Sequence, residues 1–144
     1  MQSLSQLNLL FIDDDADDGD VIKEHLLHIN PTINFTQVFD GWDAMMYLQK
    51  SVTETLPQLI VLDINMRIIN GFEFLKVIKG EERFKNIPVI VYSTSARKEH
   101  KNLSLELGAM DFYTKPDTTI GVEDIAKIFV QKLAPSQPIS TTEG

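Results

Sequence analysis

Residues 59–63 of the chain read Leu-Ile-Val-Leu-Asp, an apolar run that ends at an acidic residue. A short run without polar residues is typical of a strand that is buried on both faces of a sheet. Similar runs recur along the chain at 7–12, 33–39, 89–92 and, more weakly, 110–113. They alternate with longer segments whose apolar residues follow the helical period. This alternation predicts an α/β domain with a doubly wound parallel sheet.

Five helices are predicted between and after these strands. Asp40 is suited to cap the second helix, and Asn70 is suited to cap the third. The fourth helix is expected over 97–107, with Thr94 or Ser95 as its N-terminal cap and Gly108 at its end. The fifth helix is predicted over 121–133. The residues expected to face the sheet are Ile22, Leu26 and Ile29 in the first helix, Ala44, Tyr47 and Leu48 in the second, Phe74, Leu75 and Ile78 in the third, and Val122, Ile125, Ile128, Phe129 and Leu133 in the fifth.

The composition of the 144 residues fits one globular domain. Cysteine is absent, which excludes disulfides, thiolate zinc sites and a cysteine nucleophile. The formal charge of −8 disfavours direct DNA binding. The sequence shows neither a signal peptide nor an apolar run near the roughly 20 residues of a membrane span, so we expect a cytoplasmic protein that does not bind membranes. We expect an N-terminal extension over 1–6, a domain over 7–134 and a flexible tail over 135–144.

Acidic residues follow two of the predicted strands. Asp13, Asp14 and Asp15 come directly after the first strand, and Asp63 follows the third. The carboxyl ends of parallel strands lie at one edge of a sheet, where such folds bind ligands. Converging carboxylates repel one another unless a hard cation joins them, and an incomplete oxygen cage favours Mg²⁺ and phosphoryl chemistry.

Two further polar groups should flank the same crevice. Ser93 and Thr94 follow the fourth strand, and Lys115 followed by Pro116 comes after the fifth. A carboxylate to attack phosphorus, acids to hold a metal, and a hydroxyl and a cation to neutralise phosphoryl oxygens are the parts of an aspartyl-phosphate site. The pattern therefore indicates transient phosphorylation of an aspartate.

Five segments in register resemble the receiver domains of two-component response regulators, the CheY-like family. They are 9–15 (LLFIDDD), 59–66 (LIVLDINM), 70–73 (NGFE), 88–94 (PVIVYST) and 113–116 (YTKP). The resemblance covers about residues 7–134 in unbroken order. It implies a flavodoxin-like (βα)5 fold whose five parallel strands have the order 2-1-3-4-5.

The resemblance also implies roles for the acidic residues. Asp63 would be the phosphoacceptor. Asp13, Asp14, Asp63 and the backbone carbonyl of Asn65 would bind Mg²⁺, Asp13 through water.

Further roles follow from the same resemblance. Ser93 would sense the phosphoryl group by a hydrogen bond, and Lys115 would pair with it. The Lys115-Pro116 peptide would be cis, and Phe112 matches the switching aromatic residue. The sequence departs from the family pattern at Arg67 in place of proline, at Thr94 in place of a smaller residue and at Phe112 in place of tyrosine.

A stand-alone, single-domain response regulator is therefore expected. A sensor histidine kinase or phosphotransfer protein would donate the phosphoryl group to Asp63, and a downstream protein would bind one state of the domain. Because only 28 residues follow Pro116, we expect no output domain that binds DNA or catalyses a reaction. We expect no enzyme activity beyond self-catalysed phosphoryl transfer and autodephosphorylation. A homodimer through the fourth helix, fifth strand and fifth helix is a further possibility in this family.

Other interpretations stay open at this point. Asp13, Asp15, Asp17 and Glu24 fit positions of a calcium-binding loop, although Asp18 stands where that loop needs glycine. A phosphohydrolase would need an acid/base partner, and the sequence offers none. A phosphorelay intermediate without direct output is the remaining alternative.

Two smaller groups of charged or titratable residues have simple explanations. His25 and His28 are three residues apart but have no third metal ligand nearby, so they and His100 are expected to be solvated helix residues. The basic cluster of Arg97, Lys98, His100 and Lys101 is either a solvated face or a docking surface for an acidic partner.

Overall fold

The computed structural model describes residues 7–66 and 69–133. The strands form one parallel sheet in the order β2-β1-β3-β4-β5, which confirms the predicted topology. Strand bounds differ from the prediction by about one residue. The strands are β1 (Leu7–Ile12), β2 (Ile33–Val38), β3 (Leu59–Leu62), β4 (Val89–Ser93) and β5 (Asp111–Thr114). The predicted N-terminal extension (1–6), Arg67 and the predicted tail (135–144) lie outside the described residues.

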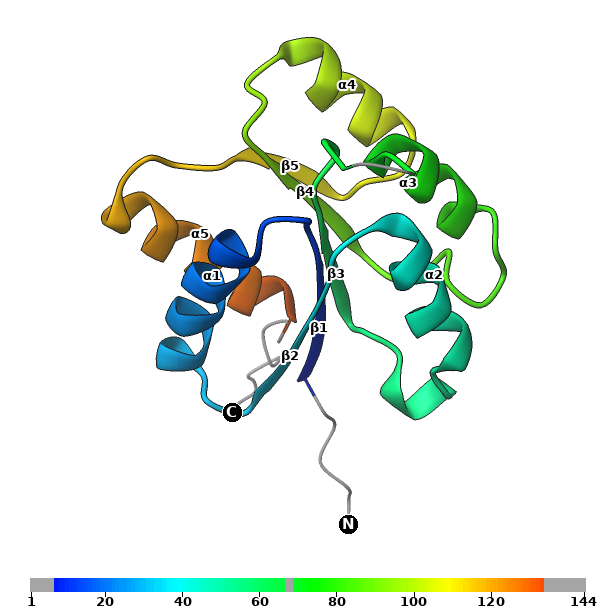
Figure 1. Ribbon diagram of the computed structural model, residues 1–144, viewed down its shortest axis with the longest axis horizontal. Coiled ribbons are helices and arrows are strands. Elements are labelled where there is room, and N and C mark those ends of the chain that lie inside the picture. Colours follow the sequence, from blue (N-terminus) through cyan, green and yellow to red (C-terminus); the bar gives the residue numbers. More distant parts are fainter. Residues whose placement is uncertain (1–6, 67–68, 134–144) are drawn as a thin grey trace, which may run out of the picture.

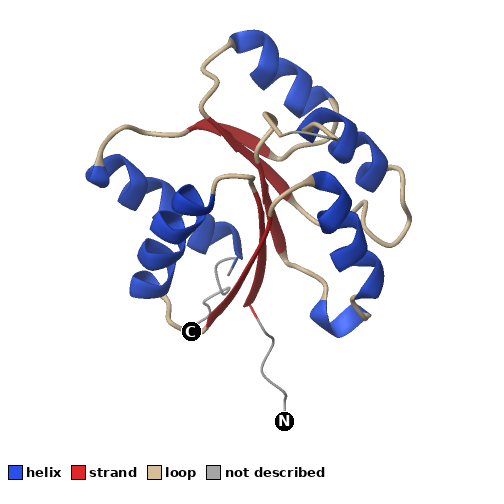
Figure 2. Cartoon of the chain, in the orientation of Figure 1, coloured by secondary structure: helices blue, strands red, loops and turns tan. Residues whose placement is uncertain are grey.

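Helices cover both faces of the sheet, as a doubly wound fold requires. Figure 1 shows α1 (Ala16–Ile29) and α5 (Thr119–Leu133) together on one face, and α2 (Gly41–Lys50) and α3 (Gly71–Lys79) on the other. The most polar helix, α4 (Lys98–Glu106), lies beside β5 and next to α3 (Figure 2). This is the expected flavodoxin-like (βα)5 arrangement. A short 3-10 turn, Thr53–Thr55, precedes β3.

The apolar runs of the central strands supply both halves of the core. Alternate side chains of a strand point to opposite faces, so Leu10 and Ile12 pack towards α2 and α3, whereas Leu9 and Phe11 pack towards α1 and α5. All four residues of β3 are buried. Burial on both faces is the reason that these strands read as continuous apolar segments rather than alternating ones.

Most of the predicted helix ends are confirmed. Asp40 accepts a hydrogen bond from the backbone N–H of Asp43 at 2.8 Å, and Asn70 accepts one from that of Glu73 at 3.0 Å. Gly108 has a φ of 112°, a conformation that residues with a Cβ rarely adopt. The second and third helices and the end of α4 therefore follow from local side-chain chemistry.

Three details of the helix prediction are wrong. The N-cap residue of α4 is Arg97 rather than Thr94 or Ser95, because Ser95 Oγ accepts from the Arg97 N–H at 3.2 Å and forms a turn before the helix. The fifth helix begins at Thr119, two residues earlier than expected. Ile29, the last residue of α1, is 37% exposed and lines a hollow with residues of α5 instead of facing the sheet. Across the described residues, no helix combines the length and apolarity needed to cross a bilayer.

Candidate functional site

The first strand and the third bring two acidic residues to one edge of the sheet. Ile12 of β1 pairs with Leu62 of β3, so Asp13 and Asp63 leave neighbouring strands at the same level. The backbone N–H of Asp63 donates to the carbonyl of Ile12 at 2.9 Å, which extends this pairing. The predicted convergence of carboxylates is therefore produced by strand register.

Asp13, Asp14 and Asp63 each offer a carboxylate oxygen, and these oxygens lie within 4.8 Å of one another. In the described part of the chain, no other group of three or more histidine, aspartate or glutamate side chains meets this condition. Asp13 and Asp63 are buried and Asp14 is exposed, so the cluster opens to solvent on one side.

Local hydrogen bonds orient the two buried carboxylates. Asp13 Oδ1 accepts from the backbone N–H of Asp15 at 2.9 Å, and Asp63 Oδ1 accepts from that of Asn65 at 3.0 Å. Burial raises the pKa of Asp13 to about 6, although the hydrogen bond from Lys115 opposes the shift. The carboxylate is thus held in place in an environment that disfavours its charge.

The donor set fits a hard divalent cation. All three side chains offer oxygen, the ligand that Mg²⁺ prefers, and an added cation would offset both the burial of Asp13 and the repulsion between carboxylates. Asn65 touches the site through its backbone N–H and through its side-chain amide, which donates to Ser93 Oγ at 3.2 Å. The role predicted for the carbonyl of Asn65 stays a prediction.

Lys115 reaches the cluster from the end of β5. Its Nζ lies 2.7 Å from Asp13 Oδ2, 2.7 Å from Asp18 Oδ2 and 3.5 Å from Asp63 Oδ2. Burial alone would lower the pKa of Lys115, but its hydrogen bonds to Asp13 and Asp18 and the nearby charge of Asp63 raise it above the ordinary value. Lys115 is therefore a fixed positive charge beside Asp63.

Asp18 is a member of the site that the sequence analysis missed. The sequence pattern places Asp18 only at the glycine position of a possible calcium-binding loop. The contact with Lys115 joins residues 97 positions apart, and no spacing rule along the chain signals it. Only the packing of α1 beside the loop after β5 brings the two side chains together.

Ser93 and Phe112 lie where the sequence predicts. Ser93 ends β4 next to the acidic cluster, and Phe112 belongs to β5. Ser93 is buried, and its Oγ accepts from Asn65 Nδ2 and from the backbone N–H of Ser95, both at 3.2 Å. Phe112 is buried against the core on the α3 side. It also lines a hollow of about 430 Å³ together with Arg97, Lys98 and Lys101 of the basic cluster.

One expectation for this loop is wrong. The Lys115-Pro116 peptide is predicted to be cis, but it is trans, as are all the other peptide bonds of the described residues. The trans form is the intrinsically favoured one even before proline, by about 0.5–1 kcal/mol. Lys115 is held instead by its backbone N–H, which donates to the carbonyl of Ser93 at 2.7 Å. Thr94, one of the departures from the family pattern, is exposed.

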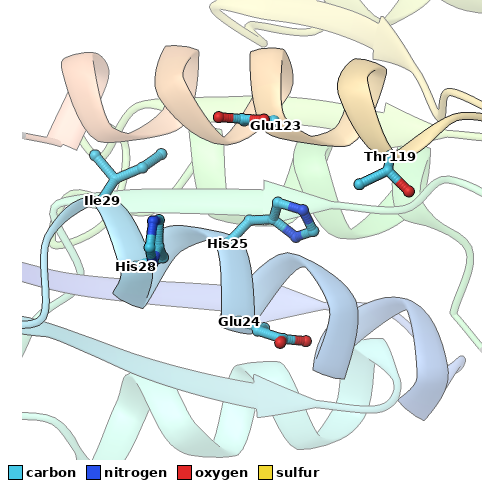
Figure 3. Close-up of a pocket in the computed structure, with 6 residues that line it drawn as sticks. All are labelled: Glu24, His25, His28, Ile29, Thr119 and Glu123. Atoms are coloured by element: carbon cyan, nitrogen blue, oxygen red, sulfur yellow. The ribbon is translucent and has the colours of Figure 1, made fainter.

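The histidines of α1 lie elsewhere. His25 and His28 line a hollow of about 460 Å³ between α1 and α5, with Thr119 and Glu123 on the opposite helix (Figure 3). His25 Nδ1 is 2.9 Å from the carbonyl oxygen of Val21, so that nitrogen is used within the helix. None of the histidines belongs to a group with metal-ligand spacing in the described residues. Of the three that were predicted to be solvated, only His28 is exposed, whereas His25 and His100 are half-buried and His100 Nδ1 lies 2.6 Å from Ser95 Oγ.

The calcium-loop interpretation finds little support in the geometry. Asp15 is the N-cap of α1 and accepts from the backbone N–H groups of Asp17 and Asp18. Asp17 and Glu24 belong to the helix itself, so the pattern spans a strand end and a helix rather than a loop between helices.

Residues 9–126 match the family described as the response regulator receiver domain. The chain belongs to this family. Within it, the receiver domain is 36% identical over 118 residues to two-component response regulator ARR3 of Arabidopsis thaliana, covering 77% of this chain and 50% of that protein. It is 29% identical over 116 residues to an uncharacterised 14.6 kDa protein of Leptolyngbya boryana, covering 81% of this chain and 84% of that one.

Solved structures agree with this assignment. The phosphorylated cyanobacterial phytochrome response regulator RcpA is 28% identical with a TM-score of 0.81, covering 92% of this chain and 98% of that one. The Mn²⁺-bound form of response regulator Rcp1 is 26% identical with a TM-score of 0.75, and the match covers 90% of this chain and 96% of that one. The protein is thus a receiver domain of a response regulator in two-component signalling.

Proposed function

We propose that this receiver domain accepts a phosphoryl group on Asp63 from a phosphohistidine of a sensor histidine kinase or phosphotransfer protein, in a reaction that depends on Mg²⁺. The observation that carries the proposal is the surrounding of Asp63. Its buried carboxylate lies beside those of Asp13 and Asp14, with the Lys115 ammonium 3.5 Å away. Acidic oxygens for a metal and a fixed cation for a phosphoryl group thus meet at one nucleophile.

Asp13, Asp14, Asp63 and the carbonyl of Asn65 would hold the metal ion. When bound, Mg²⁺ supplies positive charge that offsets the carboxylates and the phosphoryl oxygens. The protein's own contribution is to fix the oxygens: the backbone N–H groups of Asp15 and Asn65 each orient one carboxylate.

The transfer step exchanges one bond to phosphorus for another. A carboxylate oxygen of Asp63 attacks phosphorus and forms the new P–O bond, while the P–N bond to the donor imidazole breaks and its electron pair returns to nitrogen. The Lys115 ammonium is placed to pair with a phosphoryl oxygen. Ser93 Oγ accepts two hydrogen bonds from the protein and still carries one donor hydrogen, which we assign to the phosphoryl group.

The signal would leave the site through β4 and α4. Ser93 Oγ accepts from the Ser95 N–H, and Ser95 Oγ lies 2.6 Å from His100 Nδ1 in the first turn of α4. Thr114 Oγ1 donates to the carbonyl of Ser95 at 2.8 Å, which ties the end of β5 to the same turn. A movement of Ser93 towards the phosphoryl group therefore pulls on α4 and on the strand that carries Phe112, the proposed switch residue.

The output of this switch would be protein binding. We propose that a downstream protein, or a second copy of the domain through α4, β5 and α5, binds the phosphorylated state better. The exposed basic residues Arg97, Lys98 and Lys101 suit an acidic partner. The absence of enzyme activity on other substrates and the cytoplasmic location stay predictions.

Replacing Asp63 with asparagine tests the proposal. The purified domain is incubated with acetyl phosphate and Mg²⁺, and phosphorylation is measured by intact-protein mass spectrometry. We expect labelling of the unaltered protein and of Asp20→Asn, an exposed residue of α1 that loses the same charge. Asp63→Asn should show none, because an amide is not a nucleophile for phosphorus. Undiminished labelling of Asp63→Asn would refute the assignment.

A further inference from the structure

Lys115 has a second short contact that the phosphoryl-transfer machinery does not require. Its Nζ donates to Asp13 Oδ2 and to Asp18 Oδ2 at 2.7 Å each. Asp18 is not one of the carboxylates with metal-ligand spacing. It lines a hollow of about 250 Å³ together with Lys115 and Tyr92, directly beside the site.

The distances show how Lys115 is directed. A separation of 2.7 Å is a short, charge-assisted hydrogen bond, whereas 3.5 Å is too long for a good N–H···O bond. Lys115 is therefore bonded to Asp13 and Asp18 and is only an ionic neighbour of Asp63. In this state the two bonded carboxylates hold the ammonium 3.5 Å from Asp63 Oδ2.

We propose that Asp18 is a positioning residue that competes with the phosphoryl group on Asp63 for the ammonium of Lys115. This inference rests on the proposed function, since it concerns the same phosphoryl group. Asp13 and Asp18 use two of the three ammonium hydrogens and hold the nitrogen 3.5 Å from Asp63 Oδ2, so a movement of the ammonium towards a phosphoryl oxygen on Asp63 stretches at least one of these two bonds. Asp18 is the easier acceptor to release, because its side chain is 38% exposed against 1% for Asp13, so water replaces the lost bond.

If Asp18 competes for the ammonium of Lys115, loss of the Asp18 charge should make the domain bind a mimic of the phosphoryl group more tightly. Beryllofluoride with excess Mg²⁺ is the probe, and its dissociation constant is measured by isothermal titration calorimetry. We expect Asp18→Asn to bind about two- to fivefold more tightly than Asp17→Asn, the range that a partly exposed ion pair is worth. Asp17 is the matched control because it is an exposed acid in the same turn. Asp18→Ser should show the same gain with a smaller neutral side chain.

A second pair of variants separates positioning from simple charge repulsion. In a Lys115→Ala background, the difference between Asp18→Asn and Asp17→Asn should vanish, because the acceptor no longer has a lysine to hold. A difference that persists without Lys115 would mean that Asp18 merely repels the anion, and the inference would be wrong. Equal affinities of the two variants in the presence of Lys115 would overturn it as well.

The failure of the proposed function has a different signature. If the unaltered protein bound no beryllofluoride, or if Asp63→Asn bound it equally well, then phosphoryl capture at Asp63 itself would be refuted. The comparison of Asp18→Asn with Asp17→Asn is decisive only for the role of Asp18, so the two results are distinguishable.

Discussion

Replacing Asp13 with asparagine should stabilise the metal-free protein while removing its function. The side chain is 1% exposed, and burial raises its pKa from 3.8 to about 6. A shift of this size corresponds to roughly 3 kcal/mol between the two protonation states. The ionised carboxylate of Asp13 is therefore a cost to the fold at neutral pH, and a neutral side chain of the same shape avoids it.

The pH dependence has a definite sign. The folded-state pKa of Asp13 lies above the unfolded value, so its stabilising contribution is full below pH 3.8 and is lost as the pH rises through about 6. Asparagine does not titrate, so the variant does not lose stability in this way as the pH rises. The Asp15 N–H donates to Oδ1 and Lys115 to Oδ2, and in asparagine one of these oxygens is replaced by an NH2 group, so one of the two hydrogen bonds is lost and the gain is reduced. We expect Asp13→Asn to be more stable by about 2 kcal/mol at pH 7.5 and to approach the unaltered protein towards pH 4.

Urea unfolding followed by circular dichroism, in the presence of a chelator and between pH 4 and 8, measures this difference. Asp124→Asn is the control, because Asp124 is exposed on α5 and is not a member of the acidic cluster. Added Mg²⁺ should stabilise the unaltered protein and the control more than Asp13→Asn, since ligand binding to the folded state raises stability. A variant that is no more stable than the control at pH 7.5, or whose advantage grows as the pH falls, would refute the reasoning.

Two further substitutions test the packing that supports the site. Gly71→Ala would place a Cβ 2.5 Å from Ile64 Cα and 2.6 Å from the Asp63 carbonyl oxygen, so we expect a loss of about 1–3 kcal/mol in urea unfolding and weaker beryllofluoride binding. A variant as stable as the unaltered protein would contradict this close approach. Phe74→Ala empties a fully buried position of α3 and should cost about 3–5 kcal/mol by the same measurement, whereas a cost below about 1 kcal/mol would mean that the core collapses to fill the space.

The fold was predictable because its strands are buried on both faces. Leu59–Leu62 reads as a continuous apolar run only because helices cover each side of β3. The predicted strand ends are wrong where the polarity of a residue does not match its burial. The apolar character of Phe39 predicts that it belongs to the second strand, yet it lies beyond the end of an edge strand and is 46% exposed. The polar character of Ser93 predicts that the fourth strand ends before it, although Ser93 pairs with Thr114.

The acidic part of the site was predictable for a related reason. Parallel register fixes the ends of neighbouring strands, so Asp13 and Asp63 had to meet once β1 and β3 were paired. The position of Lys115 between Asp13 and Asp18 depends instead on how α1 and the loop after β5 approach each other in space. No period along the sequence encodes that distance, which is why the site lacked Asp18 until the structure was known.

The electrostatics of the site explain why stability and function oppose each other here. Among the ion pairs formed by the described residues, all those within the site use Lys115, which is shared by three carboxylates. A shared ammonium neutralises only part of that charge, and burial penalises the remainder. Neutral replacements at Asp13 and Asp18 should therefore act on ligand binding in two different ways. The Asp13 replacement removes a group needed to hold the metal, whereas the Asp18 replacement frees the lysine for the phosphoryl group. The opposite effects expected on beryllofluoride binding distinguish a ligand-holding carboxylate from a competing one, although both carboxylates lie 2.7 Å from the same nitrogen.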